Sequence, residues 1–109
     1  MNLNEYQQLA KRTAAPKGKK DELFHLVLGL MGESGEIAEK MKKIVRDNAS
    51  DFDALDKDDL KKELGDILWY IAILADYFDI ELEEIGKKNI DKLASRLERG
   101  TISGSGDNR

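Results

Sequence analysis

Apolar residues recur every three or four positions along two long segments of this chain, and this period constrains the fold more than any other feature. In the first segment, residues 22–46, the apolar residues that fall within about 40° of one another on a helix are Leu26, Leu30, Ile37, Met41 and Ile44. In the second segment they are Leu60, Ile67, Ile71, Leu74 and Phe78. No stretch of useful length alternates in the way of a β-strand. The sequence therefore predicts an all-α fold.

Two shorter helices are expected on either side of these segments. The first covers roughly residues 4–13, and the last starts in "DIELEE" at residues 79–84 and reaches about Glu98, where Gly100 provides a natural stop. Asp21 is expected to cap the second helix. Three residues compete to cap the third helix: Ser50, Asp53 and Asp56. Four helices of this kind favour a four-helix bundle.

The length of 109 residues predicts one domain with a small core. We expect a single all-α domain over residues 1–100, followed by a Gly/Ser-rich, flexible tail over residues 101–109. In "ILWYIAILA", residues 67–75, apolar side chains surround the helix, which is typical of a helix buried on all sides. A lone bundle would leave part of this surface in water. We therefore predict a homo-oligomer, a dimer or a tetramer, with the third helix near its centre.

Charge and composition exclude several classes of protein. The net charge is −4 with no long basic run, so we expect no binding of duplex nucleic acid. The longest apolar run, residues 67–75, is too short to span a bilayer, and the first residues lack the apolar core of a signal peptide. Without cysteine the chain has neither disulfides nor thiolate metal sites. These features predict a soluble, cytoplasmic protein with no membrane partner.

Two acid pairs occupy the same place on the two long segments. On a helix turning about 100° per residue, Glu33 lies about 40° from Ile37, at the margin of the apolar stripe, and Glu36 lies about 100° from it. Glu63 and Asp66 repeat these angles on the next segment, and "ESGEI" and "ELGDI" share the pattern acid-x-Gly-acid-Ile. Position on the helix, rather than spacing alone, distinguishes these pairs from the other acids of the chain.

Four carboxylates at the edge of a core repel one another, so lysines, protons or cations must compensate their charge. Lys40 and Lys43 are near, but two lysines match four acids poorly. An all-oxygen cluster suits Mg²⁺, Mn²⁺ or Ca²⁺ rather than zinc. The sole histidine, His25, argues against a di-iron carboxylate bundle, which needs a Glu-x-x-His on each of two helices.

Glycines and basic residues lie near this acidic edge. Gly29, Gly32 and Gly35 weaken the second helix and leave room either for a ligand or for the close approach of another helix. On the last helix, three residues share one edge: Asn89, Lys92 and Arg96. This row is either a solvated rim or, opposite a metal–carboxylate site, the place for an anionic substrate.

The two acid motifs, Glu33-x-x-Glu36 and Glu63-x-x-Asp66, occur here in an order and context that resemble a known family. Together with "NEYQQLAKRTA", "LGLMGESGEIAEKMKK", "KELGDILWYIAILA" and "NIDKLASR", they resemble the compact MazG-like all-α nucleoside triphosphate pyrophosphohydrolases over most of the chain. One departure is "ASRLERGTISG", where related sequences often carry an aromatic-proline step after the arginine.

This resemblance implies an activity and a set of site residues. The substrate would be a nucleoside or deoxynucleoside triphosphate, cleaved at the α-phosphorus to a monophosphate and pyrophosphate. The implied Mg²⁺ ligands, with Mn²⁺ as a substitute, are Glu33, Glu36, Glu63 and Asp66. The implied phosphate or nucleotide contacts are Lys43, Asn89, Lys92 and Arg96. Glu36 or Glu33 would also take a proton from the attacking water, and Trp69 and Tyr70 would either belong to the core or meet the base.

Two alternatives remain open on the sequence. One is a pyrophosphohydrolase of another phosphorylated substrate, such as phosphoribosyl-ATP, although the chain lacks the adjacent Glu-Glu expected of that group in the second helix. The other is a non-catalytic helical interaction protein whose acids are solvated or only bind a cation. Thermal stabilisation by divalent cations separates a bundle with solvated acids from the two enzymes.

Overall fold

The chain is all-α, and the computed structural model describes all 109 residues. Its helices are α1 (Leu3–Ala10), α2 (Glu22–Asp47), α3 (Lys57–Tyr77) and α4 (Leu82–Glu98), with short 3-10 helices η1 (Lys11–Thr13) and η2 (Phe52–Ala54). The predicted all-α class and the four helices are confirmed, and most helix ends differ from the predicted ones by only a few residues. No helix is both long and apolar enough to cross a membrane.

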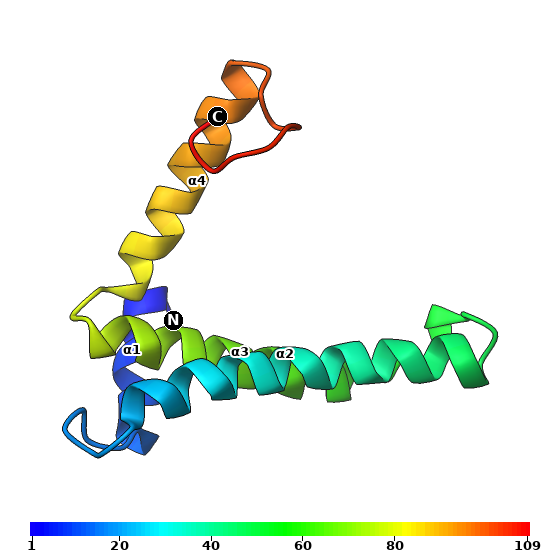
Figure 1. The fold of residues 1–109 in the computed structure, drawn as a ribbon, viewed down its shortest axis with the longest axis horizontal. Helices are drawn as coiled ribbons and strands as arrows, with labels where there is room; N and C mark the ends of the chain where they lie inside the picture. Colours follow the sequence, from blue (N-terminus) through cyan, green and yellow to red (C-terminus); the bar gives the residue numbers. More distant parts are fainter.

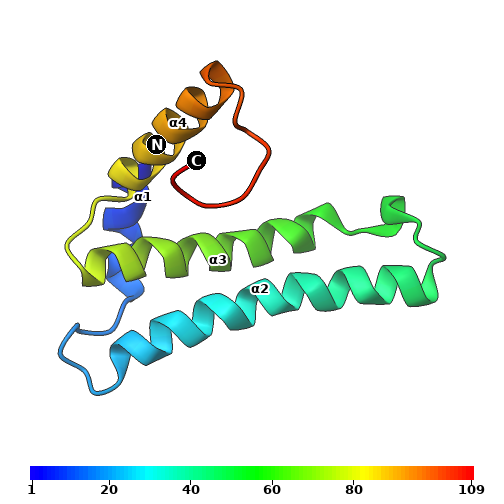
Figure 2. The same cartoon turned by 45° about the horizontal axis from the view of Figure 1, so that its top comes forward.

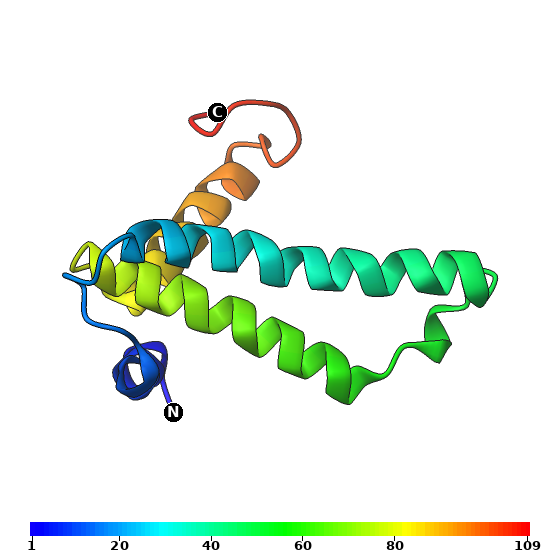
Figure 3. The same cartoon turned by 60° about the horizontal axis from the view of Figure 1, so that its bottom comes forward.

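Helices α2 and α3 form a long antiparallel hairpin, with η2 in the connection at its far end (Figures 1 and 2). Helix α1 crosses the hairpin at the opposite end, where α2 begins and α3 ends (Figure 3). The small core lies at this crossing. Its buried members are Ala10, Leu26 and Ile73, and the side chains packed against them include Tyr6, Trp69, Tyr70, Leu74 and Tyr77. The core therefore joins one residue from each of three helices.

Helix α4 leaves the hairpin and points away from it (Figures 1 and 2). Its first turn is held by side chains of α1 rather than by a local cap. The buried Gln7 donates from Nε2 to the backbone oxygen of Ile80 and accepts from the backbone N–H of Leu82, both at 3.0 Å. Asn4 Oδ1 accepts from the backbone N–H of Glu83, also at 3.0 Å. Helix α1 thus caps α4 and fixes its base.

The predicted helix ends are only partly right. Asp56 is the cap of α3, because its carboxylate accepts the backbone N–H groups of Asp58 and Asp59 at 3.0 and 3.3 Å. Gly100 has φ of +70° and ends α4 as predicted. Asp21 is the N-cap residue of α2 as predicted, but it does not cap the helix through its side chain. Its backbone is left-handed, with φ of 61°, and its carboxylate makes no capping hydrogen bond.

The four helices do not close into a bundle within one chain. Only 10 of the 109 residues are buried. The radius of gyration is 17.0 Å, whereas a compact chain of this length would have about 13 Å. The accessible surface is 7989 Å², which exceeds by roughly 1,900 Å² the value expected for a compact protein of 12.3 kDa. A bundle completed by further copies of the chain therefore stays a prediction.

Candidate metal-binding site between α2 and α3

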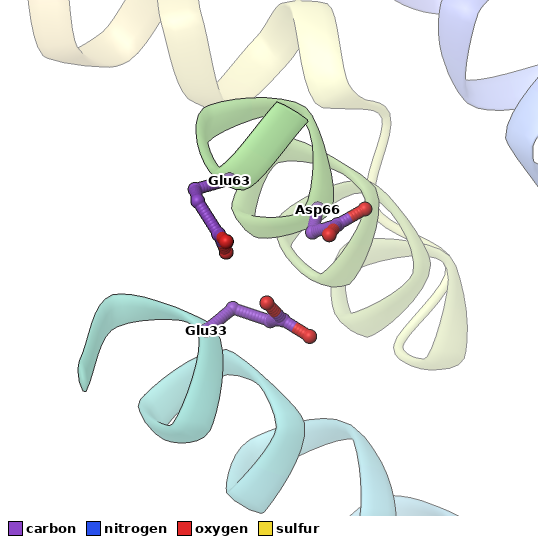
Figure 4. Close-up of side chains that lie close together, drawn as sticks. All are labelled: Glu33, Glu63 and Asp66. Carbon is purple, nitrogen blue, oxygen red and sulfur yellow. The ribbon is translucent and has the colours of Figure 1, made fainter. Parts of the chain in front are cut away.

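Three carboxylates meet between the two helices of the hairpin. Glu33 comes from α2, and Glu63 and Asp66 come from α3, where they stand one helical turn apart. One oxygen of each lies within 4.8 Å of those of the others. Figure 4 shows the side chains of Glu33 and Glu63 extending into the gap between the helices, with Asp66 beside them on α3. The structure thus brings three of the four predicted ligands together.

The electrostatics of this acidic group centre on Glu33, which is partly buried. The pKa of Glu33 is raised, first by burial and then by the charges of Asp66 and Glu63, with a smaller contribution from Glu36. Burial and neighbouring negative charges both disfavour the ionised carboxylate. A divalent cation would relieve both effects. Its positive charge would offset the acidic neighbours, and its coordination bonds to the carboxylate oxygens would replace the hydration lost on burial.

Glu36 is the predicted ligand that the structure leaves outside the group. Its side chain is exposed and offers no oxygen to the cluster, although its charge contributes to the raised pKa of Glu33. Glu36 stands one turn further along α2, about 60° further round the helix, on the side turned toward solvent.

The lysines compensate only part of this charge. Lys40 Nζ lies 3.6 Å from a carboxylate oxygen of Glu63, but it also pairs with Asp59. Sequence reasoning noticed Lys40 without placing it in the site, because only the structure shows Asp59 and Glu63 opposite it. Lys43, one of the predicted phosphate contacts, is exposed and makes no ion pair within 4.0 Å. It stands about 15 Å further along α2 than Glu33.

The basic row of α4 is not brought to the acids within one chain, because α4 points away from the hairpin (Figure 2). Asn89 is exposed and makes no side-chain hydrogen bond within the chain. Lys92 and Arg96 instead pair with Asp107 in the segment after α4. The acidic group and the basic row are therefore separate features of a single copy.

A pocket of about 280 Å³ adjoins the acids and is lined by Glu33, Asp66, Trp69 and Tyr70. The two aromatic rings also pack against the core, which is one of the two roles that the sequence left open for them. Trp69 Nε1 donates to Thr13 Oγ1 at 2.8 Å, which fixes the indole to the end of the first helical segment.

Tyr6 is a neighbour of the site that sequence reasoning missed. Its pKa is raised, first by burial and then by the charge of Asp66. The sequence shows only that Tyr6 belongs to the apolar side of α1. It does not show which helix the ring of Tyr6 faces.

Gly29 is the glycine that close packing requires. A Cβ atom built there would overlap the ring of Tyr70 from α3, whereas one built at Gly32 or Gly35 would meet nothing within 4 Å. The close approach of another helix therefore explains Gly29 within the chain. Gly32 and Gly35 leave open space on the surface of α2.

Replacing Gly29 by alanine is expected to lower the free energy of unfolding by about 1–3 kcal/mol, because Tyr70 must move out of a packed position. The matched change Gly32→Ala is expected to raise it by up to about 1 kcal/mol through helix propensity. Urea denaturation followed by circular dichroism, in buffer without divalent cations, measures both. Equal effects of the two substitutions would contradict the contact between Gly29 and Tyr70.

The fold and the site together define an all-α protein with an acidic group between paired helices. The family model described as MazG nucleotide pyrophosphohydrolase domain matches residues 22–100, which contain all three carboxylates. The chain belongs to this family, and the resemblance noted in the sequence is confirmed.

Two curated relatives are similar to this chain. The Gene 37 protein of Mycobacterium phage L5 is 45% identical over 114 aligned positions that cover 100% of both chains. The Uncharacterized protein YvdC of Bacillus subtilis (strain 168) is 38% identical over 74 positions, which cover 63% of this chain and 70% of that protein. No solved structure matches the chain.

Proposed function

We propose that this protein is a divalent-cation-dependent pyrophosphohydrolase that cleaves a nucleoside or deoxynucleoside triphosphate, standard or modified, to a monophosphate and pyrophosphate in the cytoplasm. The observation that carries the proposal is the meeting of Glu33, Glu63 and Asp66 between α2 and α3 in a member of this family. Carboxylates that lie this close together repel one another, and a bound cation would offset that repulsion.

The chemistry of the donor set fits a hard cation. All the ligand atoms are carboxylate oxygens, the pKa of Glu33 is raised by burial and then by its acidic neighbours, and Lys40 is shared with Asp59. Mg²⁺ is our first choice and Mn²⁺ the substitute, because both prefer oxygen ligands. Glu33, Glu63 and Asp66 would hold the ion, and Glu36 would join them as a fourth ligand by turning inward. A bound ion of this kind neutralises phosphate charge and lowers the pKa of a coordinated water.

The other site residues position the substrate and handle the proton. Glu36, or else Glu33, would accept the proton of the attacking water. Trp69 and Tyr70 line the pocket beside the acids, where their rings would contact the nucleoside and exclude water. Lys43, Asn89, Lys92 and Arg96 remain the proposed phosphate contacts.

We infer that the working unit is a homo-oligomer, a dimer or a tetramer. The excess surface of roughly 1,900 Å² per chain is more than twice the ~800 Å² that each partner buries in an interface of standard size. Since α4 points away from the acids of its own chain, its basic row would serve the acidic group of a neighbouring copy.

Pyrophosphate release with Mg²⁺, measured over a panel of ribo-, deoxyribo- and modified nucleoside triphosphates, tests the proposed reaction. We expect pyrophosphate and a monophosphate in equal amounts from at least one member of the panel, and neither product when Mg²⁺ is chelated. Orthophosphate and a diphosphate would show attack at a different phosphorus. If no member of the panel released pyrophosphate but Mg²⁺ still stabilised the protein, the result would favour another phosphorylated substrate or a cation-binding bundle without activity.

A further inference from the structure

The segment after α4, residues 101–109, folds back along that helix as a closed loop (Figures 1 and 2). Gly100, Gly104 and Gly106 have positive φ values of 70°, 130° and 86°, which permit the reversals of the backbone. The guanidinium of Arg109 donates to three backbone oxygens of the same segment, at 2.7–3.1 Å; these belong to Thr101, Ile102 and Gly106. The loop therefore has a defined shape held by its own hydrogen bonds.

This loop places one carboxylate on the basic row of α4. Asp107 Oδ1 lies 3.1 Å from Lys92 Nζ and 3.3 Å from a guanidinium nitrogen of Arg96. The pKa of Asp107 is lowered, first by its hydrogen bond with Lys92 and then by the other contacts of these two cations. The carboxylate is thus held in its ionised form as the anion of the pair.

One carboxylate does not use all the donors of this pair. Arg96 is buried, with 6% of its surface exposed, and its Nε atom has no hydrogen-bond partner. Asp107 is held from the solvent side, with 82% of its side chain exposed. The pair that Asp107 forms with Lys92 is exposed on both sides, at 82% and 41%, and exposed ion pairs are weak. A phosphate group brings more charge and three acceptor oxygens to the same donors, and arginine can bind it with two parallel hydrogen bonds.

We propose that Asp107 is an internal competitor that occupies the Lys92–Arg96 pair until a phosphate-bearing ligand displaces it. Residues 101–109 then act as a strap across an anion site, and the strength of this contact sets how readily that site accepts a ligand. That the natural ligand is a nucleoside triphosphate rests on the proposed function. The competition itself requires only that the cation pair bind an anion.

Isothermal titration with inorganic pyrophosphate, at low salt and without divalent cations, tests this competition in the full chain. Asp107→Asn is expected to bind pyrophosphate about three- to tenfold more tightly than the wild type, because it removes a weak competing anion. The matched control is Asp91→Asn, which removes the same charge from α4 but breaks only the pair with Lys87. It is expected to bind as the wild type does. Adding Lys92→Gln to Asp107→Asn is expected to abolish the gain.

Equal binding by the wild type and Asp107→Asn, or no binding by either, would overturn the proposal. An equal gain in Asp91→Asn would also overturn it, since the effect would then be one of net charge. The titration contains neither a nucleotide nor a metal ion. A failure of the proposed hydrolysis therefore leaves its result intact, and a failure of the competition leaves the hydrolysis assay unaffected.

Discussion

Replacing Glu63 by glutamine is expected to abolish stabilisation by Mg²⁺ and to reduce pyrophosphate release at least a hundredfold. Loss of a residue that only orients a metal ligand already costs about 10- to 100-fold in affinity or activity, so a direct ligand should cost more. Glutamine keeps the size of the side chain and its position on α3 but removes the negative charge. Thermal unfolding with and without Mg²⁺, together with the hydrolysis assay, measures both effects.

The same substitution has a second consequence, of opposite sign, that separates it from simple damage to the fold. Without divalent cations, Glu63→Gln is expected to melt at a higher temperature than the wild type, because it removes one of the charges that raise the pKa of Glu33. Lys40 still has Asp59 as its partner.

The control for this experiment is Glu39→Gln on α2. Glu39 lies outside the acidic group and pairs with Lys42 at 2.8 Å. It is expected to leave both the Mg²⁺ effect and the hydrolysis unchanged. If Glu63→Gln kept the Mg²⁺ stabilisation of the wild type, the ion would have to bind elsewhere and the proposed site would be wrong.

Replacing Phe24 by aspartate is expected to convert the proposed oligomer into folded monomers. Phe24 is 68% exposed on α2 and lines a wholly apolar groove of about 630 Å³. The groove is formed by residues from α2, from α3 with the turn that follows it, and from the start of α4: Leu23, Phe24, Val27, Leu30, Ile71, Leu74, Ala75, Phe78, Ile80 and Ile85. Burial of a phenylalanine contributes about 1.5–3 kcal/mol, and a two-fold symmetric interface uses it twice. Association should therefore weaken by roughly 10²- to 10⁴-fold.

Sedimentation velocity over a concentration series measures this change, and circular dichroism shows that the helices remain. Phe52→Asp is the matched control, because Phe52 is 51% exposed in η2 and lies outside the groove. It is expected to keep the oligomer. A wild-type protein that stays monomeric at all concentrations, or a Phe24→Asp variant that associates equally well, would contradict the proposed interface.

The sequence predicted those parts of the fold that depend on local pattern. The apolar stripes of α2 and α3 follow from a period of 3.6 residues, and Gly100 ends α4 through its own backbone conformation. The direction of α4 could not be predicted in this way. It depends on Gln7, which is 73 residues before Ile80 in the chain and meets it only in three dimensions.

The candidate site was predictable to the same extent. Equal angles about the two apolar stripes placed Glu33 and Glu63 at matching margins, so an antiparallel hairpin brings them together. The same angles could not show that Glu36 faces solvent while Asp66 joins the group. Nor could they show that Asp107 lies on Arg96, since that contact depends on turns in a segment without regular structure.

The side-chain hydrogen bonds of Gln7 hold α4 at one end only, so a small rotation there moves its far end by a larger distance. The helix has 17 residues and is therefore about 25 Å long, yet it is anchored only near its first turn. A rotation of about 10° at the held end would move the far end by roughly 4 Å, more than the length of a hydrogen bond. Helix α1 lies outside residues 22–100, the region that the family shares. A change at Gln7 or Asn4 of α1 would therefore shift Lys92 and Arg96 relative to the acidic group between α2 and α3.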